Sequence, residues 1–168
     1  MPQGIRGYWF IAALALLLAC LAIVFFTNVK RRTAHEQCAL NLKLLGMTIA
    51  GASPDPKVQQ GWDAVPNGVG FWLNHDRWPV LSPVRPVNAR QQMVLCPVVA
   101  PVKRRTGCDY RGPARSVRLL QPEEPLGADK IGNHGPGRGG YVLTKNGEVF
   151  DCKETDPLWV KAAETTSE

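Results

Sequence analysis

Hydrophobic side chains dominate one stretch near the start of the chain, Tyr8 to Phe26, which contains no charged residue. Arg6 precedes this stretch, and the basic cluster Lys30-Arg31-Arg32 follows it. A helix needs about 20 apolar residues to cross the hydrocarbon core of a bilayer, whereas a helix of a soluble domain normally keeps one polar face. The pattern therefore predicts a transmembrane helix over residues 8–29, after a short flank at residues 1–7.

A cleaved signal peptide is the alternative interpretation of this segment. Signal peptides have a shorter apolar region, of about 7–15 residues, that ends at a small-x-small cleavage site. The run here is longer, and it passes through Phe25-Phe26 into the basic cluster without an Ala-x-Ala sequence. We therefore favour an uncleaved anchor over a removed signal.

A second hydrophobic pattern follows the basic cluster, where Cys38, Leu42, Leu45 and Ile49 recur at spacings of four, three and four. This is the period of an amphipathic α-helix. Gly51 and the prolines beyond it end the pattern. The sequence predicts an amphipathic helix over residues 30–51 that continues the transmembrane helix without a break.

Residues 52–90 have a different character, because proline and glycine recur throughout them. Frequent proline and glycine residues interrupt long helices and strands, so at most a short helix is expected at Val69–Asn74. Trp62, Trp72 and Trp78 lie in the same region and indicate that it packs against the rest of the domain.

The C-terminal part has the pattern of short strands. Strands are expected at Met93–Cys96 and Cys108–Arg111. Asn146-Gly147 lies between the β-prone runs Gly140–Thr144 and Glu148–Cys152, which is the strongest short-range signal for a hairpin.

Together these patterns predict an α+β fold, in which a long N-terminal helix packs on a small antiparallel β-sheet with an irregular middle region. The expected organisation is a transmembrane first half and an amphipathic second half of that helix, followed by a globular domain at residues 52–160. A flexible tail is expected at residues 161–168, because these are mostly polar.

Basic residues are in excess, and the formal net charge is +6. A basic surplus can indicate nucleic acid or anionic lipid as a partner. Lys30-Arg31-Arg32 would lie among phospholipid head groups, and Lys103-Arg104-Arg105 is expected in a solvated loop. Because no RNP-like strand or basic helix accompanies them, the expected partner is the lipid bilayer and not nucleic acid.

Five cysteines carry information about the compartment, and Cys20 lies inside the apolar run. The other four form an even number: Cys38, Cys96, Cys108 and Cys152. None belongs to a C-x-x-C pair, and no His lies at ligand spacing beside them, so no metal site is predicted. Two disulfides in an oxidising compartment are the favoured interpretation, and four reduced core thiols are the alternative.

Catalytic and cofactor-binding motifs are weak. A G-x-G-x-x-G sequence begins at Gly135, but it precedes a strand, whereas a dinucleotide site follows one, so it is interpreted as a turn-rich loop. Asp129 and His134 lie near each other, and His75-Asp76 are adjacent, but no nucleophile motif accompanies them. We expect no catalytic residue, no cofactor and no enzyme activity; a membrane-anchored hydrolase that uses His134 or His75 is a weak alternative.

The layout of anchor, amphipathic helix, irregular middle and terminal sheet resembles bacterial type IV pilins and type II secretion pseudopilins. Short motifs carry the resemblance to pilin-like proteins with a prepilin-type N-terminus. They are the segment from Cys38 to Gly46 with Asn41, Leu42 and Lys43; Leu95-Cys96-Pro97; Cys108-Asp109-Tyr110; Asp129 to His134; and a closing hairpin with Asn146 and Gly147. The resemblance implies a membrane-anchored envelope protein with a structural or interaction role.

The N-terminus follows the family pattern only in part. The junction between Gly7 and Tyr8 resembles a prepilin cleavage site. The family has Glu at the fifth residue after the junction, where it pairs with the amino terminus of a neighbouring subunit, but this chain has Ala12. The resemblance is therefore to an uncleaved, membrane-anchored relative, and a processed minor pseudopilin of a type II secretion or type IV pilus assembly is the alternative.

Topology and disulfide pairing follow as further expectations. The count of basic residues beside the anchor weakly places the domain in the cytoplasm. The resemblance instead implies a single-pass inner-membrane protein whose C-terminal domain is periplasmic or extracellular, which agrees with the cysteines. Other pilin-like subunits or assembly components are the expected protein partners. Among the three possible pairings, Cys38–Cys96 and Cys108–Cys152 are favoured.

Overall fold

The fold is known from a computed structural model that describes residues 3–50, 56–74, 78, 93–99 and 107–168, with the side chains of residues 3–10 left out. The chain divides into two compact units, Met1–Ala34 and His35–Glu168. The fold is α+β, with an N-terminal helix packed against a five-stranded antiparallel sheet, as the sequence predicts.

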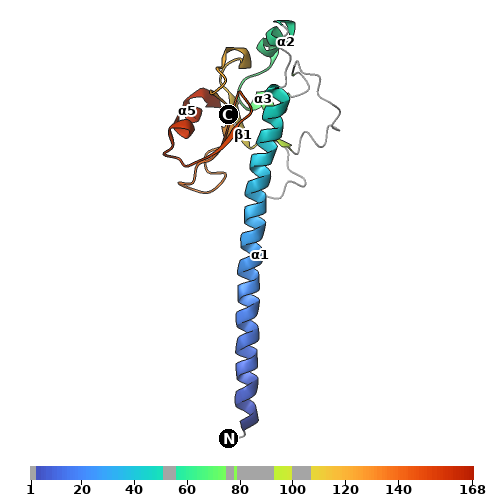
Figure 1. Cartoon of the computed structure of the whole chain (residues 1–168), viewed down its shortest axis with the longest axis vertical. Helices are drawn as coiled ribbons and strands as arrows, with labels where there is room; N and C mark the ends of the chain where they lie inside the picture. The colour runs from blue at the N-terminus through green and yellow to red at the C-terminus, as the bar shows by residue number, and fades with distance from the viewer. Residues whose placement is uncertain (1–2, 51–55, 75–77, 79–92, 100–106) are drawn as a thin grey trace. The chain divides into compact units, whose positions relative to one another are not determined.

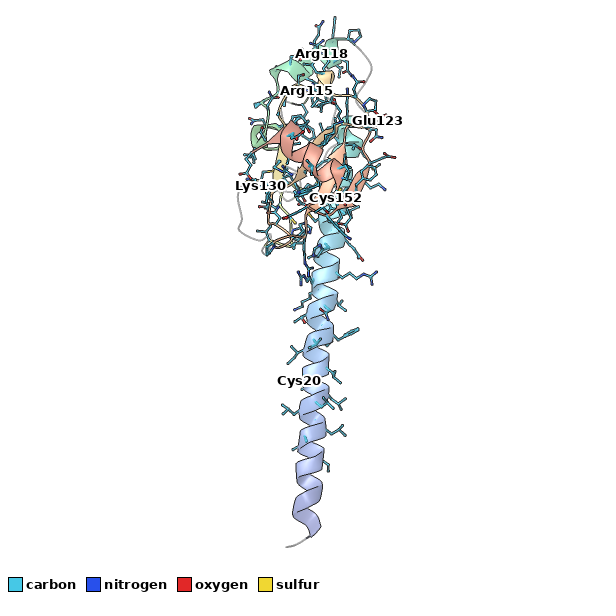
Figure 2. All side chains as sticks on the ribbon, turned by 90° about the vertical axis from the view of Figure 1, so that its left-hand side faces the viewer. Cys20, Arg115, Arg118, Glu123, Lys130 and Cys152 are labelled. Carbon is cyan, nitrogen blue, oxygen red and sulfur yellow. The ribbon has the colours of Figure 1, made fainter. Side chains whose placement is uncertain are left out.

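Helix α1 runs from Gln3 to Ala50 without interruption (Figure 1). From Ile11 to Arg32 every side chain is exposed, including Leu16 at 68 % and Phe25 at 65 % of their full area. Side chains project from several sides of this helix, as Figure 2 shows around Cys20. The helix is long and apolar enough to cross a membrane, a test that a signal sequence near the N-terminus would also pass.

The remainder of α1 belongs to the second unit and contributes one face to its core. Cys38, Leu42, Leu45 and Ile49 are all buried, with at most 5 % of their area exposed. The predicted amphipathic stripe is therefore confirmed. The described part of the helix extends to Ala50, and the predicted boundary at residue 51 lies outside the described residues.

Five short strands form the sheet, in the spatial order β4-β3-β2-β1-β5. Their bounds are Tyr110–Pro113 (β1), Pro125–Asp129 (β2), Gly140–Thr144 (β3), Val149–Cys152 (β4) and Thr166–Ser167 (β5). The predicted hairpin is confirmed as β3 and β4, which pair from Gly140 with Cys152 to Leu143 with Val149. Gly147 in the connecting turn has φ of +88°, a conformation that favours glycine.

Short helices complete the domain on both faces of the sheet. They are α2 (Pro56–Gly61), the 3₁₀ helix η1 (Trp62–Ala64), α3 (Val69–Leu73), the 3₁₀ helix η3 (Val117–Leu119) and α5 (Pro157–Thr165). Helix α3 confirms the short helix expected from the sequence. Adjacent residues Val142 and Leu143 belong to different buried clusters, because successive strand side chains point to opposite faces. The cluster that contains Leu143 also contains the α1 stripe and the tryptophans of η1 and α3, whereas Trp159 of α5 shares the other cluster with Val142.

The structure differs from the sequence-based expectations at three places. Met93–Cys96 is not a strand but a short turn, because the Cys96 N–H donates to the Asp109 carboxylate and the Leu95 carbonyl accepts from Asn41. Strand β2 was not predicted, although it lies between β1 and β3. Residues 161–168 are not a flexible tail: they hold the end of α5 and strand β5, which pairs with β1.

Gly46 marks a close approach between α1 and the hairpin. A Cβ atom added to Gly46 would lie 2.5 Å from Cδ1 of Leu143 and 3.1 Å from the Cα atom of Gly147. We expect Gly46→Val to lower the free energy of unfolding by about 1–3 kcal/mol, because the branched side chain overpacks this contact. Urea denaturation of the full chain in detergent measures the change. Lys43→Val, on the exposed side of the same helix, is the matched control, and an equal loss in both variants would contradict the packing argument.

Candidate functional site

Four side chains with potential metal-ligand or nucleophilic atoms meet inside the second unit. Cys38 comes from α1, Cys96 from the turn at residues 93–99, Asp129 from the end of β2 and His134 from the turn after it. The two sulfur atoms, a carboxylate oxygen and an imidazole nitrogen all lie within 4.8 Å of one another. All four residues are buried, with His134 the most exposed at 5 %. We refer to these four residues as the Cys-Asp-His cluster.

The contacts within the cluster are direct. The Cys38 thiol donates to Oδ1 of Asp129 at 3.3 Å, and Nε2 of His134 lies 3.0 Å from Oδ2 of the same carboxylate. Sγ of Cys96 lies 3.6 Å from Nε2 of His134. Asp129 and His134 therefore form a buried ion pair when the imidazole is protonated.

Backbone and side-chain hydrogen bonds hold the cluster residues in place. Asp129 ends β2 opposite Tyr110 of β1, and its Oδ2 accepts the Tyr141 N–H at 2.7 Å. The Cys96 N–H donates to Oδ2 of Asp109 at 2.8 Å. The end of β2 and the turn at residues 93–99 are thus each held by a hydrogen bond to a group outside the cluster.

Two further side chains contact the cluster from outside. The Tyr110 hydroxyl lies 3.4 Å from Sγ of Cys38, and Nδ1 of His35 lies 2.9 Å from Nδ1 of His134. One of the two Nδ1 atoms must carry a proton for this contact to be a hydrogen bond. His35 lies one helical turn before Cys38, so α1 supplies both residues from the same face.

Burial and mutual contact shift the pKa values of the cluster in opposite directions. Burial raises the pKa of Cys38, and the contacts with Cys96 and Asp129 add to this effect. The hydrogen bond from Cys38 lowers the pKa of Cys96 to about 6, against the effect of burial. Burial alone would lower the pKa of His134, but hydrogen bonds to Asp129 and Cys96 raise it to about 9. The two thiols therefore differ in acidity, because the pKa of Cys38 is raised and that of Cys96 is lowered.

The arrangement is not that of a nucleophilic triad. In a triad, the imidazole faces the nucleophile with one nitrogen and the orienting carboxylate with the other. Here Asp129 and Cys96 both approach Nε2, while Nδ1 meets His35. Cys96 is also completely buried, so a substrate would not reach its sulfur.

The structure brings Cys38 and Cys96 together but keeps Cys108 and Cys152 apart. All five cysteines are free thiols in this structure, and the Cys38–Cys96 disulfide stays a prediction. The favoured Cys108–Cys152 pair does not fit this sheet. Cys108 precedes β1 and Cys152 ends β4, so β2 and β3 lie between them. Three interstrand steps of about 4.8 Å exceed the Cα separation of about 7 Å that a disulfide tolerates.

The other residues singled out in the sequence lie mainly in the core, on the surface or in turns. Asn41 is buried and donates to the Leu95 carbonyl, Leu42 lies in the core, Lys43 is exposed and Pro97 is half-buried. Asn146 and Gly147 form the β3–β4 turn. Gly7 and Tyr8 lie within the α1 backbone, but their side chains, like residue His75, are outside the described part of the structure.

Sequence reasoning did not assign the cluster to a common site: it favoured a Cys38–Cys96 disulfide, noted separately that Asp129 lies near His134, and did not single out His35. Cys96 and His134 are 38 residues apart, and Cys38 and Asp129 are 91 residues apart, so no local spacing joins them. The available signal was the set of motifs behind the pilin resemblance, which includes Cys38, Leu95-Cys96-Pro97 and Asp129 to His134. Comparisons with protein-family models, with curated proteins and with solved structures gave no match for this chain.

Proposed function

We propose that this chain is a single-pass, membrane-anchored, pilin-like envelope protein with a structural or interaction role and no catalytic activity. The observation that carries the proposal is helix α1. Its described residues up to Arg32 expose apolar side chains, and its residues from Cys38 to Ile49 supply one face of the domain core. A helix that serves as anchor in one part and as core in the next is the feature that defines the pilin layout in the sequence resemblance.

The sheet and the helix sequence support the same proposal. An antiparallel sheet follows the helix and the middle region, and its C-terminal hairpin packs against Gly46 of α1. The expected partners are the lipid bilayer and other pilin-like subunits or assembly components. The expected location is the inner membrane, with the domain on the periplasmic or extracellular side.

A non-enzymatic role is supported by the geometry of the Cys-Asp-His cluster. Its groups are buried and contact one another, and the imidazole does not orient Cys96 as a nucleophile. Buried polar networks of this kind stabilise and specify a fold when each member has a partner.

Membrane fractionation tests the anchor. We expect the chain to stay with membranes after an alkaline wash, and protease added outside the inner membrane to digest the domain. A variant with both Leu17 and Leu18 replaced by Arg should lose membrane retention, because each charge at the centre of a span costs about 2.5–3.5 kcal/mol. Leu119→Arg, at an exposed position of the domain, is the control. A wild-type chain released by the wash would contradict the proposal.

Intact mass of the membrane-extracted chain separates the two pilin-like alternatives. We expect the full sequence, because Ala12 replaces the assembly Glu. A mass that lacks Met1–Gly7 would instead support a processed minor pseudopilin, for which the Gly7–Tyr8 junction is the specific observation.

A further inference from the structure

The Cys-Asp-His cluster has the composition of a metal site, assembled from four separate segments of the domain. We propose that Cys38, Cys96, Asp129 and His134 bind one zinc ion, which cross-links α1 to the turn at residues 93–99 and to the β2 end of the sheet. This structural site goes beyond the proposed pilin-like role and does not depend on it.

The distances between the ligand atoms fit tetrahedral zinc. Zinc binds thiolate at about 2.3 Å and imidazole or carboxylate at about 2.0–2.2 Å, so neighbouring ligand atoms of a tetrahedron lie about 3.3–3.8 Å apart. The Cys38–Asp129 and Cys96–His134 contacts are 3.3 and 3.6 Å, and the Asp129–His134 contact is 3.0 Å. These three contacts, made through one or the other oxygen of Asp129, are thus close to tetrahedral spacing, and the whole set of ligand atoms lies within 4.8 Å.

A metal ion would use all four side chains at once, as ligands. An ion pair accounts for Asp129 and His134 but not for two thiols beside them. A Cys38–Cys96 disulfide accounts for the two thiols but not for their contacts with Asp129 and His134. Two thiolates with an imidazole select zinc rather than magnesium or calcium, which prefer oxygen ligands. Because four protein ligands fill a tetrahedron, the site is structural and closed.

The surrounding contacts are those that orient zinc ligands. A metal-bound histidine normally donates its second ring N–H to a partner, and Nδ1 of His134 lies 2.9 Å from His35. The Tyr110 hydroxyl can donate to the Cys38 thiolate, and the Tyr141 N–H fixes the Asp129 carboxylate. A divalent cation would also neutralise two of the three negative charges of the deprotonated ligands, so binding should release protons.

Metal analysis of the full chain in detergent tests the proposal. After reduction, incubation with zinc and removal of excess ion, we expect about one tightly held zinc per chain. Cys38→Ser and His134→Gln should lower zinc content at least tenfold. Cys108→Ser and Cys152→Ser are the matched controls, since these buried cysteines lie outside the cluster, and they should retain the ion.

Cobalt binding by the wild-type chain tests the proposal even if a variant does not fold. The reduced wild-type chain loaded with cobalt should show thiolate-to-cobalt charge-transfer absorption, and zinc should displace it. A reduced, folded wild-type chain that holds no zinc would overturn the proposal. A Cys38–Cys96 disulfide in the chain as isolated would do the same.

Discussion

Trp72→Ala is expected to lower the free energy of unfolding by about 3–5 kcal/mol, which is the cost of removing a large aromatic side chain from a packed core. Trp72 of α3 is completely buried. Its ring lies over Gly127 of β2, where any Cβ atom would collide with it. The ring also packs edge-on against Phe71, with centroids 4.8 Å apart, so the variant would leave a cavity between α3 and the middle of the sheet.

A second variant that removes the indole N–H but keeps an aromatic ring separates the packing and hydrogen-bond contributions to this loss of stability. Nε1 of Trp72 donates to the Arg111 carbonyl at 3.0 Å. Trp72→Phe keeps much of the ring volume but leaves that carbonyl without its partner, so a smaller loss of about 1–3 kcal/mol is expected. Chemical denaturation of the full chain in detergent measures both variants. Leu73→Ala, at the adjacent but exposed position, is the control, and a loss as large as that of Trp72→Ala would contradict this account.

Asp129→Ala is the second substitution with a large expected effect, because Asp129 is completely buried and paired with His134. Removing one partner of a buried ion pair costs about 3–5 kcal/mol. The variant also removes the acceptor of the Tyr141 N–H and of the Cys38 thiol. Asp151→Ala, at an exposed position of β4, should change stability little.

A double-mutant cycle assigns this loss to the pair. Asp129→Ala and His134→Gln are measured singly and together in the metal-free chain. Because the two side chains contact each other, the double variant should lose less stability than the sum of the single variants. Strictly additive losses would show that the two residues stabilise the domain independently.

The sequence predicts the elements whose signal is local. The amphipathic spacing of Cys38 to Ile49 and the Asn146-Gly147 turn depend on neighbouring residues, and both are confirmed. Strand β2 is different, because its sequence Pro-Leu-Gly-Ala-Asp has no β-branched residue. Its strand conformation comes from pairing on both edges, and Gly127 is needed there because Trp72 covers it.

The Cys-Asp-His cluster could be recognised only once the fold was known, for a related reason. Metal-ligand rules applied to the sequence search for close spacing, whereas these four residues come together only when α1 packs on the sheet. The motifs that suggested the pilin resemblance already contained all four residues. Their shared location could not be derived from the sequence, because it depends on the antiparallel register that places Asp129 beside Tyr110 and Tyr141.

The course of helix α1 determines where the chain can be truncated to isolate the domain. The compact unit begins at His35, fifteen residues before α1 ends at Ala50. A fragment cut at the end of the helix would expose the hydrophobic side of the sheet, because Cys38, Leu42, Leu45 and Ile49 would be missing. The boundary between the exposed apolar segment and the compact domain therefore falls inside one continuous helix, and a truncation that isolates the domain must be made there.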